Sequence, residues 1–321
     1  MKAMIIKAFG GPEVLEPAEW PRPEPGPGQL LVRVLASSVN PVDFKIRRAG
    51  GWAGVAPPAV IGYDVAGVVE AVGPGVAGFA RGAKVFYTPH IFGRPGTYAE
   101  LHVVDADIVV PKPENLTFLE AASLPLAGGT AWDAVVRLAA VRPGETVLIH
   151  AGAGGVGSLA VQLARAAGAR VIATCSAANA ALVRSLGADV VVDYRAQDPA
   201  QAALAATGGR GVEVAFDTVG GDTLARTIAA MRPYGRMVTC VSSTADLSAA
   251  LGRNLTVHFE FLERASHKME ALRVLAERGQ LRPVIDSVVP LERVAEAHRR
   301  IEAGGMRGKI VLRVADGAEQ R

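Results

Sequence analysis

A glycine pattern in the middle of the chain constrains the fold more than any other feature. Gly152, Gly154 and Gly157 are spaced as G-x-G-x-x-G. The apolar run 146–150 before them has the character of a buried strand, and residues 156–168 after them have helical spacing. A strand, this glycine turn and a helix in that order are typical of a segment that binds the pyrophosphate of a dinucleotide.

Each glycine has a separate physical task in such a turn. Gly152 permits the tight turn, Gly154 lets the backbone approach the phosphates, and Gly157 allows the helix to pack closely on the strand. The opening of the helix, through Gly155 and Val156, then offers free N–H groups and the positive end of the helix dipole to an anion. The alternative is a glycine-rich turn that serves the backbone alone.

The acidic residue that usually follows about 20 residues later is missing. Residues 171–180 contain no Asp or Glu, and Ser176 lies in this region with Arg184 further on. A small hydroxyl side chain near positive charge suits a 2′-phosphate, so we expect NADPH in preference to NADH. Tyr194, with Arg195 beside it, either closes the adenosine end of the site or is an ordinary solvated strand end.

The rest of the chain has two different characters. Residues 1–111 contain frequent short strands between glycine and proline residues, which indicates an antiparallel barrel or sandwich. From Thr117, an expected helix N-cap with Glu120 three residues on, the pattern changes to alternating strands and helices, as in a parallel sheet covered on both faces. The tail, from about residue 265, adds two amphipathic helices and a last strand.

Composition excludes several classes of protein. The 321 residues are 50% hydrophobic and 20% charged with a net charge of +3, and basic residues do not alternate with aromatic ones as nucleic-acid binding requires. The two cysteines, Cys175 and Cys240, lie 65 residues apart in apolar segments, where we expect core positions in a reducing compartment. We expect a cytoplasmic protein with no secretory signal and no membrane span.

Several motifs together resemble one family. "NPVDFKIRRAGG", "GYDVAGVVEAVGPGV", "PLAGGTAWDAV" and "FDTVGGDTLARTIAAMRPYGRMV" occur in the order typical of the medium-chain dehydrogenase/reductases, in their zinc-independent quinone oxidoreductase (zeta-crystallin-like) branch. The resemblance implies an α/β chain. Residues 1–122 and 262–321 would form a GroES-like, β-rich catalytic domain, and residues 123–261 a Rossmann NADP-binding domain with a doubly wound parallel sheet. It also implies an active site in the cleft between them.

The residues at the zinc positions of this superfamily argue against a metal. Alcohol dehydrogenases of the superfamily place a Cys near the position of Ser37, Ser38 and Asn40, and a His-Glu pair where this chain has Tyr63 and Asp64. They also carry a lobe of four closely spaced cysteines, whereas no cysteine precedes Cys175 here. We therefore expect no metal ligands and reject a zinc alcohol dehydrogenase.

The resemblance implies a reductase that transfers hydride from NADPH to quinones or to α,β-unsaturated carbonyl compounds. Asn40 would orient the cofactor or the substrate carbonyl, or it is a turn residue before Pro41. Asp43 would maintain hydrogen bonds in the pocket, or it is a first-turn acid of a helix. Trp52 stands where the family often has Tyr, and Tyr63 stands where it has a small residue. Tyr63 is therefore either a proton donor or a wall of the pocket.

Three further residues match cofactor positions of the family. Thr130 would lie by the nicotinamide carboxamide, or it caps the start of a helix. Ser242 and Ser243 would lie near the nicotinamide side, or they fill a loop. Ala180 replaces a lysine that contacts the 2′-phosphate in some members, which weakens the preference for NADPH.

Two other functions stay open at this point. One is an enoyl-thioester reductase, and the other is a protein that binds NADPH without catalysis. Relatives commonly form homodimers through edge strands, so the segment 246–263 is expected to be either such an edge strand or an internal strand of the sheet.

Overall fold

The chain forms two compact units in a computed structural model that describes residues 1–242 and 244–321. Unit 1 comprises Met1–Gly129 and Glu263–Arg321, and unit 2 is the continuous segment Thr130–Leu262. Within the described residues, no helix is both long and apolar enough to span a bilayer.

Unit 2 is built on a six-stranded sheet in which every pair of neighbouring strands is parallel. The strand order is β11-β10-β9-β12-β13-β14. Numbered along the chain this is 3-2-1-4-5-6, the order of a dinucleotide-binding doubly wound sheet. The strands are β9 Thr146–Ile149, β10 Arg170–Cys175, β11 Val190–Asp193, β12 Val212–Asp217, β13 Met231–Thr239 and β14 Thr256–Phe259. The predicted alternation and fold class are therefore confirmed.

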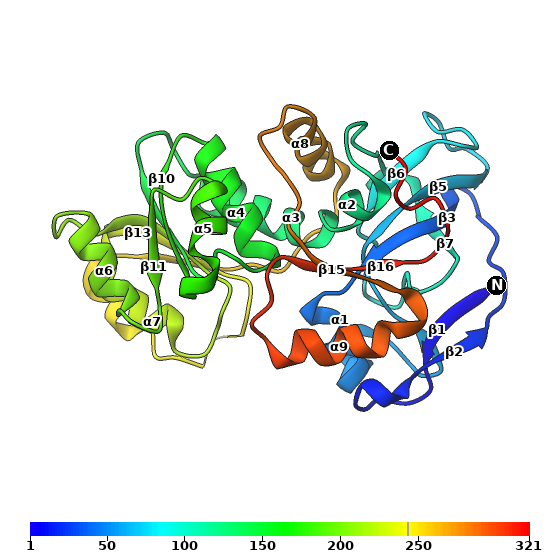
Figure 1. Ribbon diagram of the computed structural model, residues 1–321, viewed down its shortest axis with the longest axis horizontal. Helices are drawn as coiled ribbons and strands as arrows, with labels where there is room; N and C mark the ends of the chain where they lie inside the picture. The colour runs from blue at the N-terminus through cyan, green and yellow to red at the C-terminus, as the bar shows by residue number, and fades with distance from the viewer. Residues whose placement is uncertain (243) are drawn as a thin grey trace. The chain divides into compact units, whose positions relative to one another are not determined.

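Helices cover both faces of this sheet (Figure 1). One face packs apolar residues such as Leu148, Ile172 and Met237 against Ala203 and Leu224 of the helices on that side. Successive side chains of a strand point to opposite faces, which leaves the alternate strand residues for the other helices. The helices are α4 Gly155–Ala166, α5 Ala180–Ser185, α6 Pro199–Ala206 and α7 Thr223–Thr227, with shorter turns η5 Ala177–Asn179, η6 Ile228–Ala230 and η7 Ser248–Arg253.

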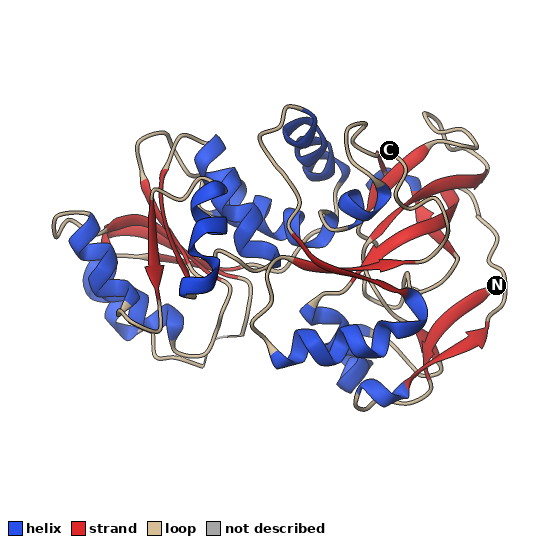
Figure 2. Cartoon of the chain, viewed as in Figure 1, coloured by secondary structure: helices blue, strands red, loops and turns tan. Residues whose placement is uncertain are grey.

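Unit 1 contains two sheets together with several helices (Figure 2). Its larger sheet runs β15-β16-β3-β5-β6-β8 with β7 paired to β3, and its smaller sheet runs β2-β1-β4. The strands are β1 Lys2–Ile6, β2 Leu15–Glu19, β3 Gln29–Ser38, β4 Ala59–Val60, β5 Val65–Val72, β6 Lys84–Tyr87, β7 Leu101–Asp105, β8 Val110–Pro111, β15 Ile285–Pro290 and β16 Lys309–Arg313. Strand β16, red in Figure 1, lies antiparallel beside the blue β3, with Val311 opposite Ser38, so the tail of the chain completes a sheet that its beginning starts.

The helices of unit 1 include one that the strand-rich pattern did not predict. Helix α1, Pro41–Ala49, begins because Asn40 is extended, Pro41 occupies the first turn and the Asp43 carboxylate accepts the Asn40 N–H at 2.7 Å. The other helical segments of this unit are η1 Pro12–Val14, η2 Gly50–Ala53, η3 Ala106–Ile108, α2 Phe118–Ala122, α8 Ser266–Glu277, η8 Leu291–Arg293 and α9 Val294–Ala303.

The predicted capping box at the start of α2 is confirmed. The Thr117 hydroxyl accepts the Glu120 N–H at 3.1 Å, and a Glu120 carboxylate oxygen accepts the Thr117 N–H at 2.8 Å. The helical pattern that follows is not one helix, because Pro125 restarts it. It divides into α2, α3 Pro125–Trp132 and the π-helical segment η4 Asp133–Leu138.

Candidate active site

The glycine turn of unit 2 follows β9 directly and leads into α4. Gly154 is the N-cap, and α4 begins at Gly155. A Cβ on Gly157 would lie 2.2 Å from the carbonyl oxygen of Ala151, and one on Gly152 would lie 2.9 Å from the Ala173 Cβ. Both positions therefore favour glycine: at Gly157 the first turn of the helix lies against the backbone of the turn, and at Gly152 the turn lies against the Ala173 side chain of β10.

The turn is held against the neighbouring strand β10. Ala151 adopts a left-handed conformation, with φ of +50°. Its N–H donates to the Thr174 hydroxyl at 3.0 Å, and the Gly152 N–H donates to the Thr174 carbonyl at 2.8 Å. Thr174 was not among the residues that the sequence suggested, because a threonine inside an apolar strand has no distinctive pattern.

The first turn of α4 leaves N–H groups available. In a helix that begins at Gly155, the amides of Gly155, Val156 and Gly157 have no acceptor within the helix. The positive end of the helix dipole adds to their attraction for an anion. Gly155 and Val156 are only partly buried, so this end of the helix is accessible from solvent. The turn can therefore hold phosphate oxygens through backbone groups alone.

The residues predicted near the adenosine end gather at the carboxyl ends of β10 and β11. Ser176 directly follows β10 as the N-cap of η5, and Asn179 donates to its hydroxyl at 3.4 Å. Arg184 lies near the end of α5 and is exposed. Tyr194 is 49% exposed after β11, with the Arg195 guanidinium 5.7 Å from the centre of its ring.

An acidic residue does stand at this edge, one strand later than the usual position. Asp193 ends β11 in register with Cys175, and its carboxylate accepts the Arg195 N–H at 3.0 Å. Burial, and then the charge of Asp193, raise the pKa of the Cys175 thiol above its ordinary value, although Arg184 acts in the opposite direction. Charges of both signs therefore act at the end of β10.

The structure describes two of the three residues predicted on the nicotinamide side, Thr130 and Ser242. Thr130 lies in the second half of α3 and is buried, so the alternative that it caps the start of a helix is wrong, because α3 already begins at Pro125. Ser242 is exposed after β13. Ser243 lies outside the described residues.

Three of the four predicted catalytic residues of unit 1, Asn40, Asp43 and Tyr63, belong to one buried group of side chains, which we call the polar cluster. Its members are Asn40, Asp43, Tyr63, Asp64, Tyr98 and Lys309, all at most 6% exposed. Oδ2 of Asp43 accepts the backbone N–H of Asn40 and the Tyr98 hydroxyl, both at 2.7 Å. Asp43 is thus a first-turn acid of α1 as well as a member of this cluster.

Two polar atoms of the cluster have no hydrogen-bond partner within the described part of the chain. They are Oδ1 of Asp43 and the hydroxyl of Tyr63. Burial raises the pKa of Asp43 to about 7, although Tyr98, the Asn40 N–H and Lys309 act in the opposite direction. Burial and then Asp43 raise the pKa of Tyr63 above its ordinary value. Tyr63 is therefore neutral and can donate a hydrogen bond, and Asp43 holds a proton that it can donate below about pH 7.

Behind Tyr98, a chain of hydrogen bonds fixes its direction of donation. Arg47 Nη1 lies 3.0 Å from Nδ1 of His298, and because arginine only donates, Nδ1 accepts. His298 therefore carries its proton on Nε2, which lies 3.2 Å from the Tyr98 hydroxyl. Burial, then Arg47, lowers the pKa of His298 to about 3. The neutral imidazole leaves the Tyr98 proton to point at Asp43.

Asp64 joins distant segments of unit 1. Its carboxylate accepts from the Ser38 hydroxyl at 2.6 Å, Asn40 Nδ2 at 2.7 Å and the Leu126 N–H at 2.8 Å, and Lys309 Nζ lies 3.4 Å away. The second of the two superfamily zinc positions is thus held by an acid surrounded by donors. No group of three or more His, Cys, Asp or Glu suited to a metal ion occurs among the residues that the structure describes.

Trp52 lies apart from this buried network. It belongs to η2 and is 50% exposed, and its ring meets that of Phe92, 56% exposed, edge to face at 6.1 Å. An exposed aromatic pair of this kind offers a flat apolar surface to a ring-shaped ligand.

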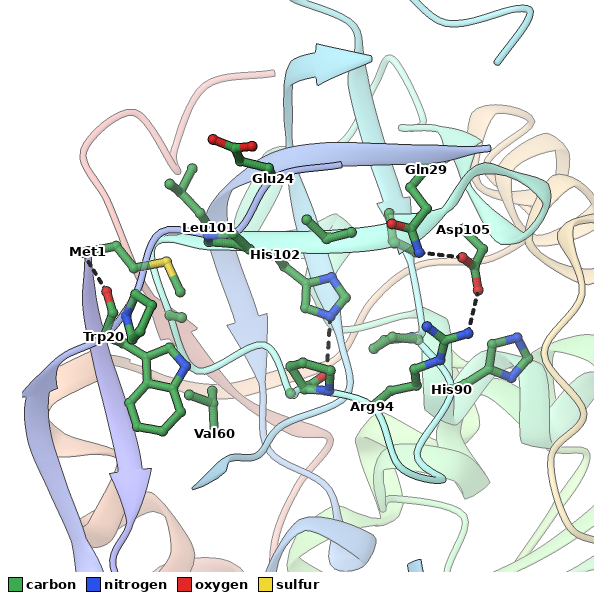
Figure 3. A pocket seen from close by; sticks show the side chains of 18 of the residues that line it. Met1, Trp20, Glu24, Gln29, Val60, His90, Arg94, Leu101, His102 and Asp105 are labelled. Carbon is green, nitrogen blue, oxygen red and sulfur yellow. Dashed lines mark hydrogen bonds and ion pairs between the residues drawn. The ribbon is translucent and has the colours of Figure 1, made fainter. Parts of the chain in front are cut away.

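A pocket of about 300 Å³ also occurs in unit 1, but it contains none of the predicted site residues (Figure 3). Several of its polar groups pair with one another. Asp105 accepts from Gln29 at 2.9 Å and lies 3.5 Å from Arg94, and His102 Nε2 lies 3.2 Å from the Pro95 carbonyl. We therefore assign no function to this pocket.

Comparisons with known proteins agree over nearly the whole chain. The Alcohol dehydrogenase GroES-like domain family matches residues 26–114, and the Zinc-binding dehydrogenase family matches residues 186–312. Human quinone oxidoreductase is 33% identical over 325 residues, which cover 97% of each chain. The chain belongs to the quinone oxidoreductases of the medium-chain dehydrogenase/reductase family.

Other members of this family support the same assignment. The 2-methylene-furan-3-one reductase of Solanum lycopersicum is 33% identical over 97% of this chain and 79% of its own. The quinone oxidoreductase of Coxiella burnetii has a TM-score of 0.90 at 34% identity, covering 98% of this chain and 99% of its own. An NAD-dependent alcohol dehydrogenase has a TM-score of 0.91 at 36% identity, with 98% and 100% covered. This medium-chain dehydrogenase/reductase is therefore an oxidoreductase that uses a nicotinamide dinucleotide and a small-molecule substrate.

Proposed function

We propose that this oxidoreductase transfers hydride from NADPH to quinones or α,β-unsaturated carbonyl compounds without zinc. The observation that carries this proposal is the polar cluster of unit 1, whose two unpartnered atoms belong to groups that favour their neutral, donating forms. The names of the relatives, quinone oxidoreductase and 2-methylene-furan-3-one reductase, support acceptors of these two classes.

The residues of unit 2 fit the dinucleotide. The amides of Gly155, Val156 and Gly157 would bind the pyrophosphate, and Ser176 with Arg184 would bind the 2′-phosphate. Tyr194 would pack on the adenosine, while Thr130, Ser242 and Ser243 would lie on the nicotinamide side. In this proposal unit 2 is the NADP-binding domain, and unit 1 is the GroES-like catalytic domain.

The residues of unit 1 would stabilise the oxygen on which charge develops. When bound, NADPH supplies hydride from its nicotinamide C4 carbon to the electrophilic atom of the acceptor. The electron pair displaced onto the carbonyl oxygen then needs hydrogen-bond donors, which Asn40 and Tyr63 provide. Asp43 keeps Tyr98 and the start of α1 in place, and a solvent proton completes the reduction. Trp52 and Phe92 would form an apolar surface for the acceptor ring.

Steady-state kinetics with a panel of quinones, free enones and an enoyl-CoA test the proposed function. We expect turnover of quinones or free enones that is insensitive to chelators, in protein that contains no stoichiometric zinc by elemental analysis. Preference for the enoyl-CoA would favour a thioester reductase, and tight NADPH binding without any turnover would favour a non-catalytic protein. A requirement for zinc would contradict the proposal.

The preference for NADPH needs its own test, because Asp193 places a negative charge at the same edge of the sheet. The ratio of kcat/KM for NADPH to that for NADH should exceed one in the wild type. It should fall by about tenfold in Arg184→Ala, the scale of one exposed charge contact to phosphate. Arg165→Ala is the matched control, because Arg165 pairs with Asp189 on the exposed surface of unit 2. Equal efficiencies in the wild type would contradict the preference.

We also propose a homodimer formed through β14. This strand is at the edge of the six-stranded sheet, and the side chains of Phe259 and Phe261 are 65% and 57% exposed. An exposed edge strand with apolar side chains is a suitable surface for pairing with a second copy. Sedimentation velocity at micromolar concentration should show a dimer. A monomer there would contradict this part of the proposal.

A further inference from the structure

Lys309 occupies an unusual position for a lysine. It is the first residue of β16, only 6% exposed, and its ammonium group reaches into the polar cluster. Nζ donates to the Val39 carbonyl at 3.0 Å and to Oδ1 of the Asn40 amide, and it lies 3.4 Å from the Asp64 carboxylate. A buried lysine needs such partners, because an unpaired buried charge is very costly.

The partners of Asn40 determine the orientation of its amide. A lysine ammonium can only donate, so Oδ1 of Asn40 faces Lys309. An ionised carboxylate can only accept, so Nδ2 faces Asp64. Rotating the amide by half a turn would set two donors against each other at Lys309 and two acceptors against each other at Asp64. Both contacts therefore specify the same orientation.

This orientation determines what Asn40 can offer to a ligand. Nδ2 carries two hydrogens, and Asp64 uses one of them. The remaining N–H is a donor on a side chain whose rotation is blocked at both ends. A donor fixed before the reaction stabilises a developing oxyanion without reorganisation. The charge of Lys309 is meanwhile offset by Asp64, so the cluster presents this donor without a net positive charge.

We propose that Lys309 is a positioning residue that locks the Asn40 amide with one N–H directed to the carbonyl oxygen of the substrate. The proposal rests on the proposed function, because it assigns this N–H to the acceptor of the hydride. It needs no contact between Lys309 and the substrate.

The principal test compares Lys309→Met with Lys309→Arg. Loss of the ammonium removes the donor to Oδ1 and leaves the amide held only through Nδ2 at Asp64, so its position is less restricted and kcat should fall in Lys309→Met by up to about 10²-fold, the scale of one lost oxyanion donor. The Kd for NADPH should not change, because unit 2 binds it. Lys309→Arg keeps a donor for Oδ1 and should recover part of kcat. Lys112→Met is the matched control, because Lys112 is also buried in unit 1 but donates only to the carbonyls of Pro113 and Leu116.

A readout that does not depend on turnover separates positioning from general stability. Lys309 lowers the pKa of Asp43, so Lys309→Met should raise the midpoint of the Asp43 titration, followed by carbon-13 NMR of its carboxyl group. Lys112→Met should leave it unchanged. The other groups that act on the pKa of Asp43 are unchanged in this variant: Tyr98, Asp64 and the Asn40 N–H. Tyr63, whose own pKa Asp43 raises, also stays, as do His298 and Arg47, which are hydrogen-bonded in series behind Tyr98.

The outcomes distinguish this inference from the proposed function. If the wild type reduces no quinone or enone, the proposed function fails, and the Asp43 titration still tests the place of Lys309. If Lys309→Met keeps wild-type kcat, or if it loses no more activity than Lys112→Met, the positioning role is wrong. Should Lys309→Met not fold, Asn40→Asp tests the same donor, because it keeps an acceptor for Lys309 but removes the N–H. Wild-type kcat in that variant would overturn the inference.

Discussion

The glycine turn of unit 2 and the polar cluster of unit 1 are built in opposite ways. The turn comes from contiguous residues, and its working groups are backbone amides at the opening of α4. The cluster brings together side chains from the start of α1, the segment before β5, the segment before β7 and β16, with sequence separations of up to 269 residues. The turn exposes backbone N–H groups where side chains are absent, whereas the cluster holds its side chains through hydrogen bonds and leaves two polar atoms without a partner among the described residues.

This difference determines how each region responds to a substitution. Adding a single carbon atom to the turn displaces backbone, which no side-chain rotation can relieve. Removing a single donor from the cluster leaves an acceptor unsatisfied but leaves the backbone in place. The first change should therefore affect folding and cofactor affinity together, and the second should affect turnover more than affinity.

The largest effect is expected for Gly157→Ala. Its Cβ would lie 2.2 Å from the Ala151 carbonyl oxygen, so the turn must shift and the amides lose their alignment. We expect NADPH affinity to fall by at least about 10²-fold, together with a loss of about 1–3 kcal/mol of folding free energy from overpacking. Calorimetry and denaturant unfolding measure both. Gly154→Ala, whose Cβ would lie 3.3 Å from the same oxygen, should show the smaller effect. Equal affinities in both variants would show that the close contact with the Ala151 oxygen does not control cofactor binding.

Asn40→Ala tests the other side of the comparison. We expect kcat/KM for the acceptor to fall by about 10²-fold, since one oxyanion donor is lost, while the Kd for NADPH is retained. Kinetics and calorimetry on the same preparation measure the two effects. Asn115→Ala is the control, because Asn115 donates to the Ala276 carbonyl elsewhere in unit 1. A loss of NADPH affinity as large as the loss of kcat/KM would show that the cluster is not specialised for turnover.

The pH dependence of the free energy of unfolding reports the protonation of Asp43 in the polar cluster. The pKa of Asp43 rises from 3.8 to about 7 on folding, so the folded protein holds a proton that the unfolded chain releases above about pH 4. This group therefore contributes stability that is fully present below pH 3.8 and is lost as the pH rises to about 7. The slope is on the order of 1.4 kcal/mol per pH unit.

Asp43→Asn should remove that slope. Urea unfolding of the wild type and of Asp43→Asn between about pH 4.5 and 8, the range over which the Asp43 pKa is shifted, measures the difference in their free energies of unfolding. The free energy of unfolding of the wild type should decline relative to the variant up to about pH 7 and run parallel to it above. Parallel curves throughout would show that Asp43 is ionised in the folded state.

The smallest effect is expected for Tyr63→Phe. The hydroxyl has no partner among the described residues, so its removal should leave stability unchanged or slightly increased. If the hydroxyl donates to the substrate, kcat should still fall by about tenfold, the value of a single neutral hydrogen bond. Thermal unfolding and kinetics on the same preparation make the measurement. Unchanged kcat would show that Tyr63 is only a wall of the pocket.

The sequence predicted the fold class well because its signals are local. A strand, a glycine turn and a helix with β-branched runs around them identify a doubly wound sheet without knowledge of distant contacts. Helix α6, Pro199–Ala206, was missed because its alanine-rich sequence lacks a clear apolar stripe. Helix α1 was foreseen only as an alternative, with Asp43 as a first-turn acid, because it is short and lies between strands, although the Asn-Pro-x-Asp start indicates it.

The polar cluster was only partly accessible from the sequence. Asn40, Asp43 and Tyr63 were found through a family resemblance and not through a pattern of their own. Tyr98 and Lys309 were not found, because a tyrosine in a strand-like segment and a lysine at a strand end are usually solvated or apolar contacts. The role of Lys309 depends on the pairing of β16 with β3, and that of Tyr98 on contacts with Asp43 and His298, all between segments far apart in the sequence.

Because β16 follows unit 2 in the sequence, it can pair with β3 only after unit 2 has been synthesised. A ribosome adds residues from the first to the last, so the whole of Thr130–Leu262 has been translated well before Lys309. A nascent chain, or one shortened by proteolysis ahead of β16, contains the complete glycine turn but lacks the cation that donates to Asn40. Under the proposed function, such a chain would have the segment for the coenzyme without the full set of side chains for reduction.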